Sequence, residues 1–110
     1  MVEVNNEFIQ QENKFLAWVE IDYVPFNDVV RIFSGYSKLI PTEEEYLQAL
    51  DFLSYLSNKY GARLKCLEGP DMQEMKKPIP ELINWLKEMW YANKYKEINY
   101  GVWFDLLEEE

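Results

Sequence analysis

The chain has 110 residues, with 11 basic and 20 acidic side chains and a formal net charge of −9. Hydrophobic residues make up 48% of it, which excludes a largely disordered chain. Because binding to phosphates needs clustered Lys and Arg, the acidic balance argues against direct nucleic-acid binding. The length predicts a single domain over residues 1–110, in which 1–13 and 108–110 are candidates for fraying.

The sequence also indicates a compartment. Cys66 is the only cysteine, so no disulfide can form within the chain. The first residues contain no basic start followed by an apolar run, and no apolar stretch reaches the ~20 residues that cross a bilayer. These features predict a soluble, cytoplasmic protein without a signal peptide and without a membrane partner.

Two segments near the start have contrasting patterns. In residues 14–24, apolar side chains from Phe15 to Tyr23 recur at period two, which predicts a strand that ends at Pro25. In residues 26–34, the apolar side chains are three to four positions apart. This spacing favours a short helix, but the β-branched content leaves a strand open.

The clearest element is a helix from Thr42 to Tyr60. Thr42 and Glu45 match a capping box, in which each side chain satisfies the other residue's free backbone N–H. Apolar side chains follow at helical spacing, and Gly61 comes directly after the last of them, where a C-terminal cap is expected. These signals agree on both ends of the helix.

The second half of the chain adds two strands and a helix. Residues 63–68 predict a short strand, 70–80 an irregular connection, 81–94 a helix and 98–107 a last strand. The order is β-α-α-β-α-β, and helical crossovers favour partly parallel strands. We therefore expect an α+β or small α/β fold with a roughly three-stranded mixed sheet and the helices packed on one face.

Most catalytic chemistry is missing from this composition. The absence of histidine excludes Ser-His-Asp and Cys-His systems, and one cysteine cannot supply a structural zinc site. The four glycines form no phosphate-binding loop. We therefore predict no cofactor, no metal and no catalytic residue. The remaining enzymatic alternative is a carboxylate site for Mg²⁺ or Ca²⁺ built from Glu20, Asp22 and Asp105.

Strand periodicity predicts an acidic, aromatic sheet face. The sides of the three strands that point away from the core carry Trp18, Glu20 and Asp22, then Arg63, Lys65 and Leu67, and finally Trp103 and Asp105. Ordinary cross-strand pairing explains such charges. Two tryptophans on one open face are less ordinary, because indoles are usually mostly buried. This face is a candidate partner-binding surface, unless a helix or the N-terminal arm covers it.

A second acidic group stands at the start of the long helix. Glu43 and Glu44 are candidate partner-binding residues, although favourable interaction with the helix dipole explains them equally well. An acidic surface accelerates and orients binding to a basic partner, and aromatic side chains supply the anchors that charge alone does not.

Together these features predict a non-enzymatic protein-binding module that occludes a basic, nucleic-acid-binding surface of a target protein. Immunity proteins, antitoxins and phage inhibitors of the anti-CRISPR kind act in this way, with carboxylates in the place of phosphates. The element order is loosely similar to that of barstar-type nuclease inhibitors, in pattern alone. One alternative is a structural subunit or homodimer that buries the aromatic face, and the second is the carboxylate enzyme. On the first hypothesis, alanine at Trp18 or Trp103 weakens partner binding and leaves the fold intact.

Overall fold

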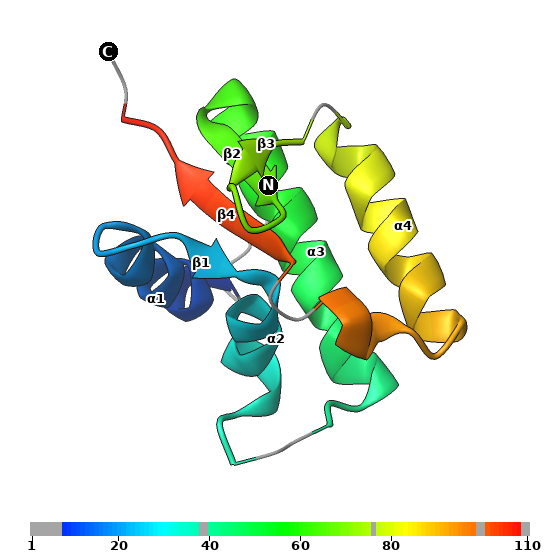
Figure 1. The fold of residues 1–110 in the computed structure, drawn as a ribbon. Coiled ribbons are helices and arrows are strands. Elements are labelled where there is room, and N and C mark those ends of the chain that lie inside the picture. Colours follow the sequence, from blue (N-terminus) through cyan, green and yellow to red (C-terminus); the bar gives the residue numbers. More distant parts are fainter. Residues whose placement is uncertain (1–7, 38–39, 76, 99–100, 109–110) are drawn as a thin grey trace.

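Four helices lie against one face of a four-stranded sheet (Figure 1). The structure, a computed structural model, describes residues 8–37, 40–75, 77–98 and 101–108. Its elements are α1 (Ile9–Val19), β1 (Val24–Pro25), α2 (Phe26–Ser34), α3 (Glu43–Tyr60), η2 (Gly61–Arg63), β2 (Leu64–Glu68), β3 (Gln73–Glu74), α4 (Ile79–Tyr91), η3 (Tyr95–Ile98) and β4 (Val102–Leu106). Within those residues, no helix has the length and apolar character needed to cross a bilayer.

The strand order is β1-β4-β2-β3, and every neighbouring pair is antiparallel. Phe104 of β4 is paired with Val24 on one side and with Cys66 on the other. The predicted α+β class is confirmed, but the expected three-stranded mixed sheet needs correction. β4 enters between β1 and β2 antiparallel to both, and the short β3 extends the sheet through a hairpin with β2. Helical connections of this length allow a strand to return in either direction.

The strand predicted over residues 14–24 is wrong, because most of this segment belongs to helix α1. Phe8, Glu12, Phe15 and Val19 are three to four positions apart and lie on the side of the helix that faces the core. The carboxylate of Glu12 interrupts this apolar stripe, although its side chain is buried. The helical period was therefore hidden by a buried charge, while the run from Phe15 to Val19 also fitted a period of two.

The structure describes only part of the two chain ends for which fraying was predicted, residues 1–13 and 108–110. Residues 9–13 form the first part of α1. Residues 1–7 and 109–110 lie outside the described residues. Residue 108 follows β4 with an exposed side chain.

Helices α2 and α3 follow the local signals in the sequence. Residues 26–34, for which the sequence allowed a helix or a strand, form a helix that begins after Pro25. The helix is followed by Gly35, whose φ of 88° favours glycine. Both hydrogen bonds of the predicted capping box are present in α3. Glu45 N donates to Thr42 Oγ1 over 3.1 Å, and Thr42 N donates to Glu45 Oε1 over 2.8 Å.

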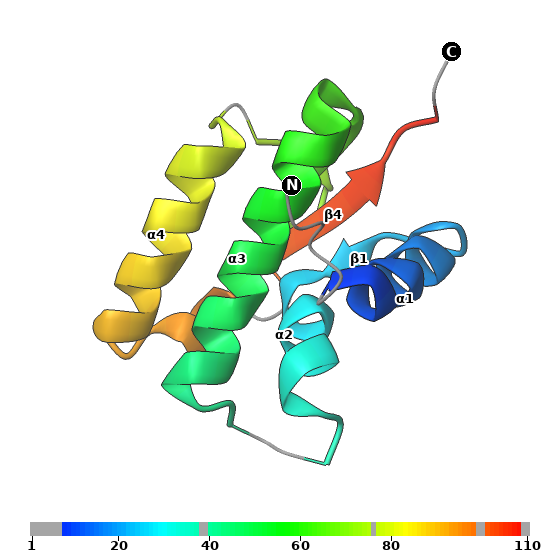
Figure 2. The same cartoon turned by 180° about the vertical axis from the view of Figure 1, so that it is seen from behind.

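The core lies between the helices and the inner face of the sheet, and Figure 2 shows the helices from their side of the molecule. Tyr46 of α3 is fully buried against the rings of Phe26 in α2 and Trp90 in α4, and its hydroxyl donates a hydrogen bond of 2.7 Å to the backbone oxygen of Leu86 in α4. This bond satisfies the hydroxyl, which is the one polar group that a tyrosine side chain buries in an apolar core. It also connects α3 to α4.

The burial of Cys66 predicts that its thiol reacts slowly in the native protein. Cys66 lies in β2 with its side chain buried, and burial, aided by the negative charge of Glu68, raises its pKa to about 12 from the ordinary value of 9.0. At mildly alkaline pH this thiol should hold about a thousandfold less thiolate than a free one. We expect a disulfide reagent to label the native protein far more slowly than the denatured protein, measured by absorbance. Equal labelling rates would contradict this environment for Cys66.

Candidate interaction surface

The outer face of the sheet, opposite the helices, carries part of the predicted site. The register places Lys65 opposite Asp105 and Leu67 opposite Trp103, and it places Pro25 of β1 on the other side of Trp103. These strand residues therefore share one face, as strand periodicity predicts. In Figure 1 this face is turned toward the viewer, and the helices lie behind it.

The charges of this outer face are largely engaged within the molecule. Lys65 Nζ lies 3.1 Å from Glu74 Oε2 of the neighbouring strand. Asp105 Oδ1 accepts a hydrogen bond of 2.9 Å from the backbone N–H of Leu106. Trp103 is half-buried and has contacts of its own. The outer face is therefore less acidic and less open than the sequence suggests.

The structure does not bring Trp18, Glu20 and Asp22 onto the sheet. Trp18 belongs to α1, packs against the core, and meets the ring of Tyr36 edge-on at a centroid distance of 6.1 Å. Glu20 is exposed at the C-terminal end of α1. Asp22 lies in the following turn, where its Oδ1 accepts a 2.7 Å hydrogen bond from the N–H of Tyr23. The predicted face with two tryptophans is thus not formed, because its first strand is a helix.

Two further residues of the predicted face and helix start have local roles. Arg63 lies in η2 and not in β2, and its Nε donates to the backbone oxygen of Leu107 over 2.9 Å. Glu43 accepts a hydrogen bond of 3.2 Å from the hydroxyl of Tyr91, which connects the start of α3 to the end of α4. Glu44 is exposed in the first turn of α3, where the helix dipole stabilises a carboxylate.

A different part of the molecule combines acidic and aromatic side chains around open space. A hollow of about 500 Å³ lies between the β2–β3 turn, the start of β4 and one flank of α4. Glu68 and Asp71 line it from the hairpin, and Trp85 and Met89 line it from the helix. A tight turn at Gly69, whose φ is 76°, brings the two acids to the same end of the sheet.

A second hollow, of about 350 Å³, shares Trp85 with the first. Glu81 and Glu88 line it, and helical spacing explains their presence, since residues four before and three after Trp85 lie on the same side of α4. The ammonium group of Lys77 is 5.4 Å from the centre of the Trp85 ring, within the range of a cation–π interaction. We call this region the Trp85 surface, and define it by Glu68, Asp71, Lys77, Glu81, Trp85, Glu88 and Met89.

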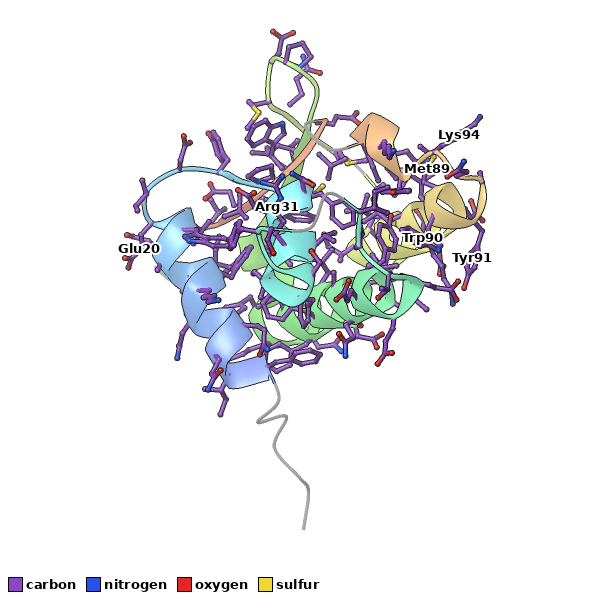
Figure 3. All side chains as sticks on the ribbon, turned by 90° about the horizontal axis from the view of Figure 1, so that it is seen from below. Glu20, Arg31, Met89, Trp90, Tyr91 and Lys94 are labelled. Atoms are coloured by element: carbon purple, nitrogen blue, oxygen red, sulfur yellow. The ribbon has the colours of Figure 1, made fainter. Side chains whose placement is uncertain are left out.

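The carboxylates of the Trp85 surface are free to interact with a partner. All four acids are exposed, and none forms an ion pair with any residue that the structure describes. Trp85 and Met89 are half-buried, so each is held by the core on one side and accessible on the other. Figure 3 shows that Glu20 lies at the opposite side of the molecule from Met89, so Glu20 is not part of this surface.

The sequence analysis missed this surface for a physical reason. Trp85 is three positions from Leu82 and next to Leu86, so helical spacing predicts that it is buried with them, whereas only Leu82 and Leu86 of α4 are buried. The two acids that flank Trp85 on α4 were a usable signal at helical spacing. Glu68 and Asp71 could not be added from sequence, because their position depends on how the hairpin meets α4.

A second feature that sequence analysis missed is a buried acid between α1 and α3. Glu12 is only 5% exposed. Its Oε1 accepts a 2.6 Å hydrogen bond from the hydroxyl of Tyr55, and its Oε2 accepts from Lys59 Nζ over 2.8 Å and from the hydroxyl of Tyr60. We call these four side chains the Glu12 network. It satisfies a charge that would otherwise be costly to bury.

The pKa values of the Glu12 network follow from these contacts. Burial alone raises the pKa of Glu12, but the hydrogen bonds from Lys59 and the two tyrosines outweigh it, and the net shift is downward. Burial and the bond to Glu12 raise the pKa of Tyr60 to about 12. The pKa of Lys59 is raised, chiefly by its bond to Glu12. The carboxylate is therefore charged, and the phenols and ammonium are protonated, throughout the neutral range.

The carboxylate alternative finds no geometry to support it. Among the residues that the structure describes, no three acidic, histidine or cysteine side chains gather in a way that could hold a metal ion, so Glu20, Asp22 and Asp105 do not come together as such a group. Comparisons with known protein families, curated proteins and solved structures find no match to the chain. The fold and its surfaces are therefore the basis for a functional proposal.

Proposed function

We propose that this chain is a non-enzymatic protein-binding module that acts in the cytoplasm and occludes a basic surface of a target protein. The targets that fit this chemistry best are proteins that bind nucleic acid, because they present clustered Lys and Arg. The proposal makes the chain an inhibitor or immunity-type antagonist. One observation carries it: the half-buried indole of Trp85 lies between two hollows edged by four exposed carboxylates that form no ion pair with a described residue.

Physical arguments support the choice of this surface. Binding energy at protein interfaces is concentrated in a few aromatic and arginine side chains near the centre of the contact. Charges around such an anchor steer the encounter and select partners of opposite sign. The net charge of −9 extends that attraction beyond the contact itself. The outer face of the sheet lacks this combination, since its acids are engaged within the molecule.

The test is capture of binding proteins from a lysate of the source cells, followed by elution in steps of rising salt. We compare the wild type with a variant that neutralises the Trp85 surface, E68Q/D71N/E81Q/E88Q. The matched control neutralises four acids that were predicted from the sequence, E20Q/D22N/E43Q/E44Q. Both variants have the same net charge, so a general charge effect acts on them equally.

The proposal expects one dominant nucleic-acid-binding protein that the wild type and the control retain and the Trp85 surface variant loses. Its release at raised salt is expected, because exposed charge pairs are screened. Equal retention by both variants, or equal loss from both, would show that the Trp85 surface does not select the partner.

A second candidate function is a subunit that buries the outer face of the sheet against another copy. Half-buried Leu67 and Trp103 lie side by side on that outer face, and Ile21, in the turn before β1, is 84% exposed. A subunit of this kind should form a concentration-dependent dimer in sedimentation, and Trp103→Glu should dissociate it. A monomer at every concentration would remove this candidate.

A further inference from the structure

We propose that the hollow between the β2–β3 turn and α4 receives an arginine side chain of the basic partner. This inference rests on the function proposed above and specifies how the contact is made. The guanidinium lies between the carboxylates of Glu68 and Asp71 and against the indole of Trp85. Its aliphatic stem lies on Met89.

The hollow is large enough to receive a side chain from a partner. Its volume of about 500 Å³ lies within the range of roughly 300–1,000 Å³ that small-ligand sites occupy. Its lining combines polar and apolar groups, with the acids on the hairpin side and the aromatic and thioether groups on α4. Arginine is amphipathic in the same way, with an apolar stem and a charged end.

The charge of the hollow is not balanced by its own lining. Glu68 and Asp71 are exposed acids, and among the residues that the structure describes no lysine or arginine lines the hollow. The adjoining hollow differs in this respect, because Lys77 lines it together with Glu81 and Glu88. A cation supplied by a partner would offset part of the negative charge of the first hollow, as the positive charge of Lys77 does in the second.

The resident lysine shows that this indole accepts a cation. Lys77 is exposed, and its Nζ lies 5.4 Å from the centre of the Trp85 ring. Cations lie over the faces of tryptophan in preference to other rings. Arginine fits the first hollow better than lysine, because a planar guanidinium both stacks on an indole and binds carboxylates through two parallel N–H groups.

The experiment is an NMR titration of the full chain at low ionic strength with N-acetyl-arginine methylamide. The citrulline derivative, which has the same shape without the charge, and the lysine derivative are the comparison ligands. The signals to follow are the indole N–H of Trp85, assigned with Trp85→Phe, and the backbone amides of Gly69 and Gly101, which line the hollow. We expect saturable shifts at these signals with millimolar affinity for arginine, several-fold weaker binding of lysine and none of citrulline.

Two variants with equal charge locate the binding. E68Q/D71N neutralises the hollow and should weaken arginine binding at least tenfold, whereas E81Q/E88Q neutralises the adjoining hollow and should leave most of it. Absence of saturable shifts, equal binding of citrulline or lysine, or equal effects of the two variants would overturn the inference.

The outcome also separates this inference from the proposed function. If the fourfold Trp85 surface variant loses its partner but arginine does not bind the hollow, the arginine contact is wrong and the surface remains the interface. If arginine binds and that variant still retains the partner, the hollow binds guanidinium groups but the Trp85 surface is not the interface.

Discussion

Replacing Trp85 with alanine is expected to weaken binding of the basic partner by about 30-fold or more, which corresponds to about 2 kcal/mol. The change removes the aromatic centre of the surface and leaves the four surrounding acids in place. Long-range attraction is therefore retained, and most of the loss should appear as faster dissociation. Titration calorimetry and surface plasmon resonance with the captured partner measure the two quantities.

Control variants distinguish lost contact from lost folding. Because Trp85 packs against the core, its truncation also lowers stability, so binding is measured where circular dichroism shows a folded protein. Trp85→Phe keeps a ring and should lose less affinity than the alanine variant. Trp103→Phe changes the outer sheet face and should leave affinity unchanged. A large loss with Trp103→Phe and none with Trp85→Ala would move the interface to the sheet.

Replacing Glu12 with alanine is expected to lower the free energy of unfolding by about 2–3 kcal/mol. Removing one member of a buried, hydrogen-bonded ion pair usually costs about 3–5 kcal/mol. The lower figure applies here because Lys59 is half-exposed and regains water, which leaves mainly the hydroxyls of Tyr55 and Tyr60 without their acceptor. Urea denaturation at neutral pH measures the loss. A change below about 0.5 kcal/mol, typical of a surface site, would contradict the network.

The pH dependence of this contribution has a definite sign. The pKa of Glu12 is lowered in the folded protein, so its charge stabilises the fold above the ordinary pKa of 4.5, and this stabilisation disappears as the pH falls through the lowered value. The wild type should therefore be more stable than Glu12→Gln at neutral pH, and the gap should close in acid. Denaturation of both proteins over that pH range checks this, and a gap that is constant or widens in acid would contradict it.

The fold was predictable where the signals were local. The capping box of Thr42 and Glu45 and the helix end at Gly61 depend on neighbouring residues, and the structure confirms them. The strand predicted over residues 63–68 is also a local signal, and it is present as β2 from Leu64 to Glu68. The first helix was missed because Glu12 occupies a core position, and the Tyr55, Lys59 and Tyr60 partners that permit this are more than 40 positions away. The antiparallel insertion of β4 likewise depends on long-range pairing that no local pattern encodes.

The sequence predicts the chemical character of the candidate site but only part of its position in the fold. The composition alone indicated an acidic, aromatic surface. The outer sheet face holds Trp103 and Asp105 as expected. Trp18, Glu20 and Asp22 do not lie on it, because most of the segment predicted as the first strand belongs to helix α1. The Trp85 surface joins two helix acids to two hairpin acids, and only the packing of α4 beside the hairpin turn creates it.

Site-specific photo-crosslinking in the source cells is the most direct test of the Trp85 surface as the interface. A photoreactive residue is placed at position 71 or 88 of that surface, and at position 22 or 44 as controls among the acids predicted from sequence. If the Trp85 surface is the interface, one crosslinked partner is expected from positions 71 and 88 and none from positions 22 and 44. Crosslinks to a partner from 22 or 44, with none from 71 and 88, would contradict it.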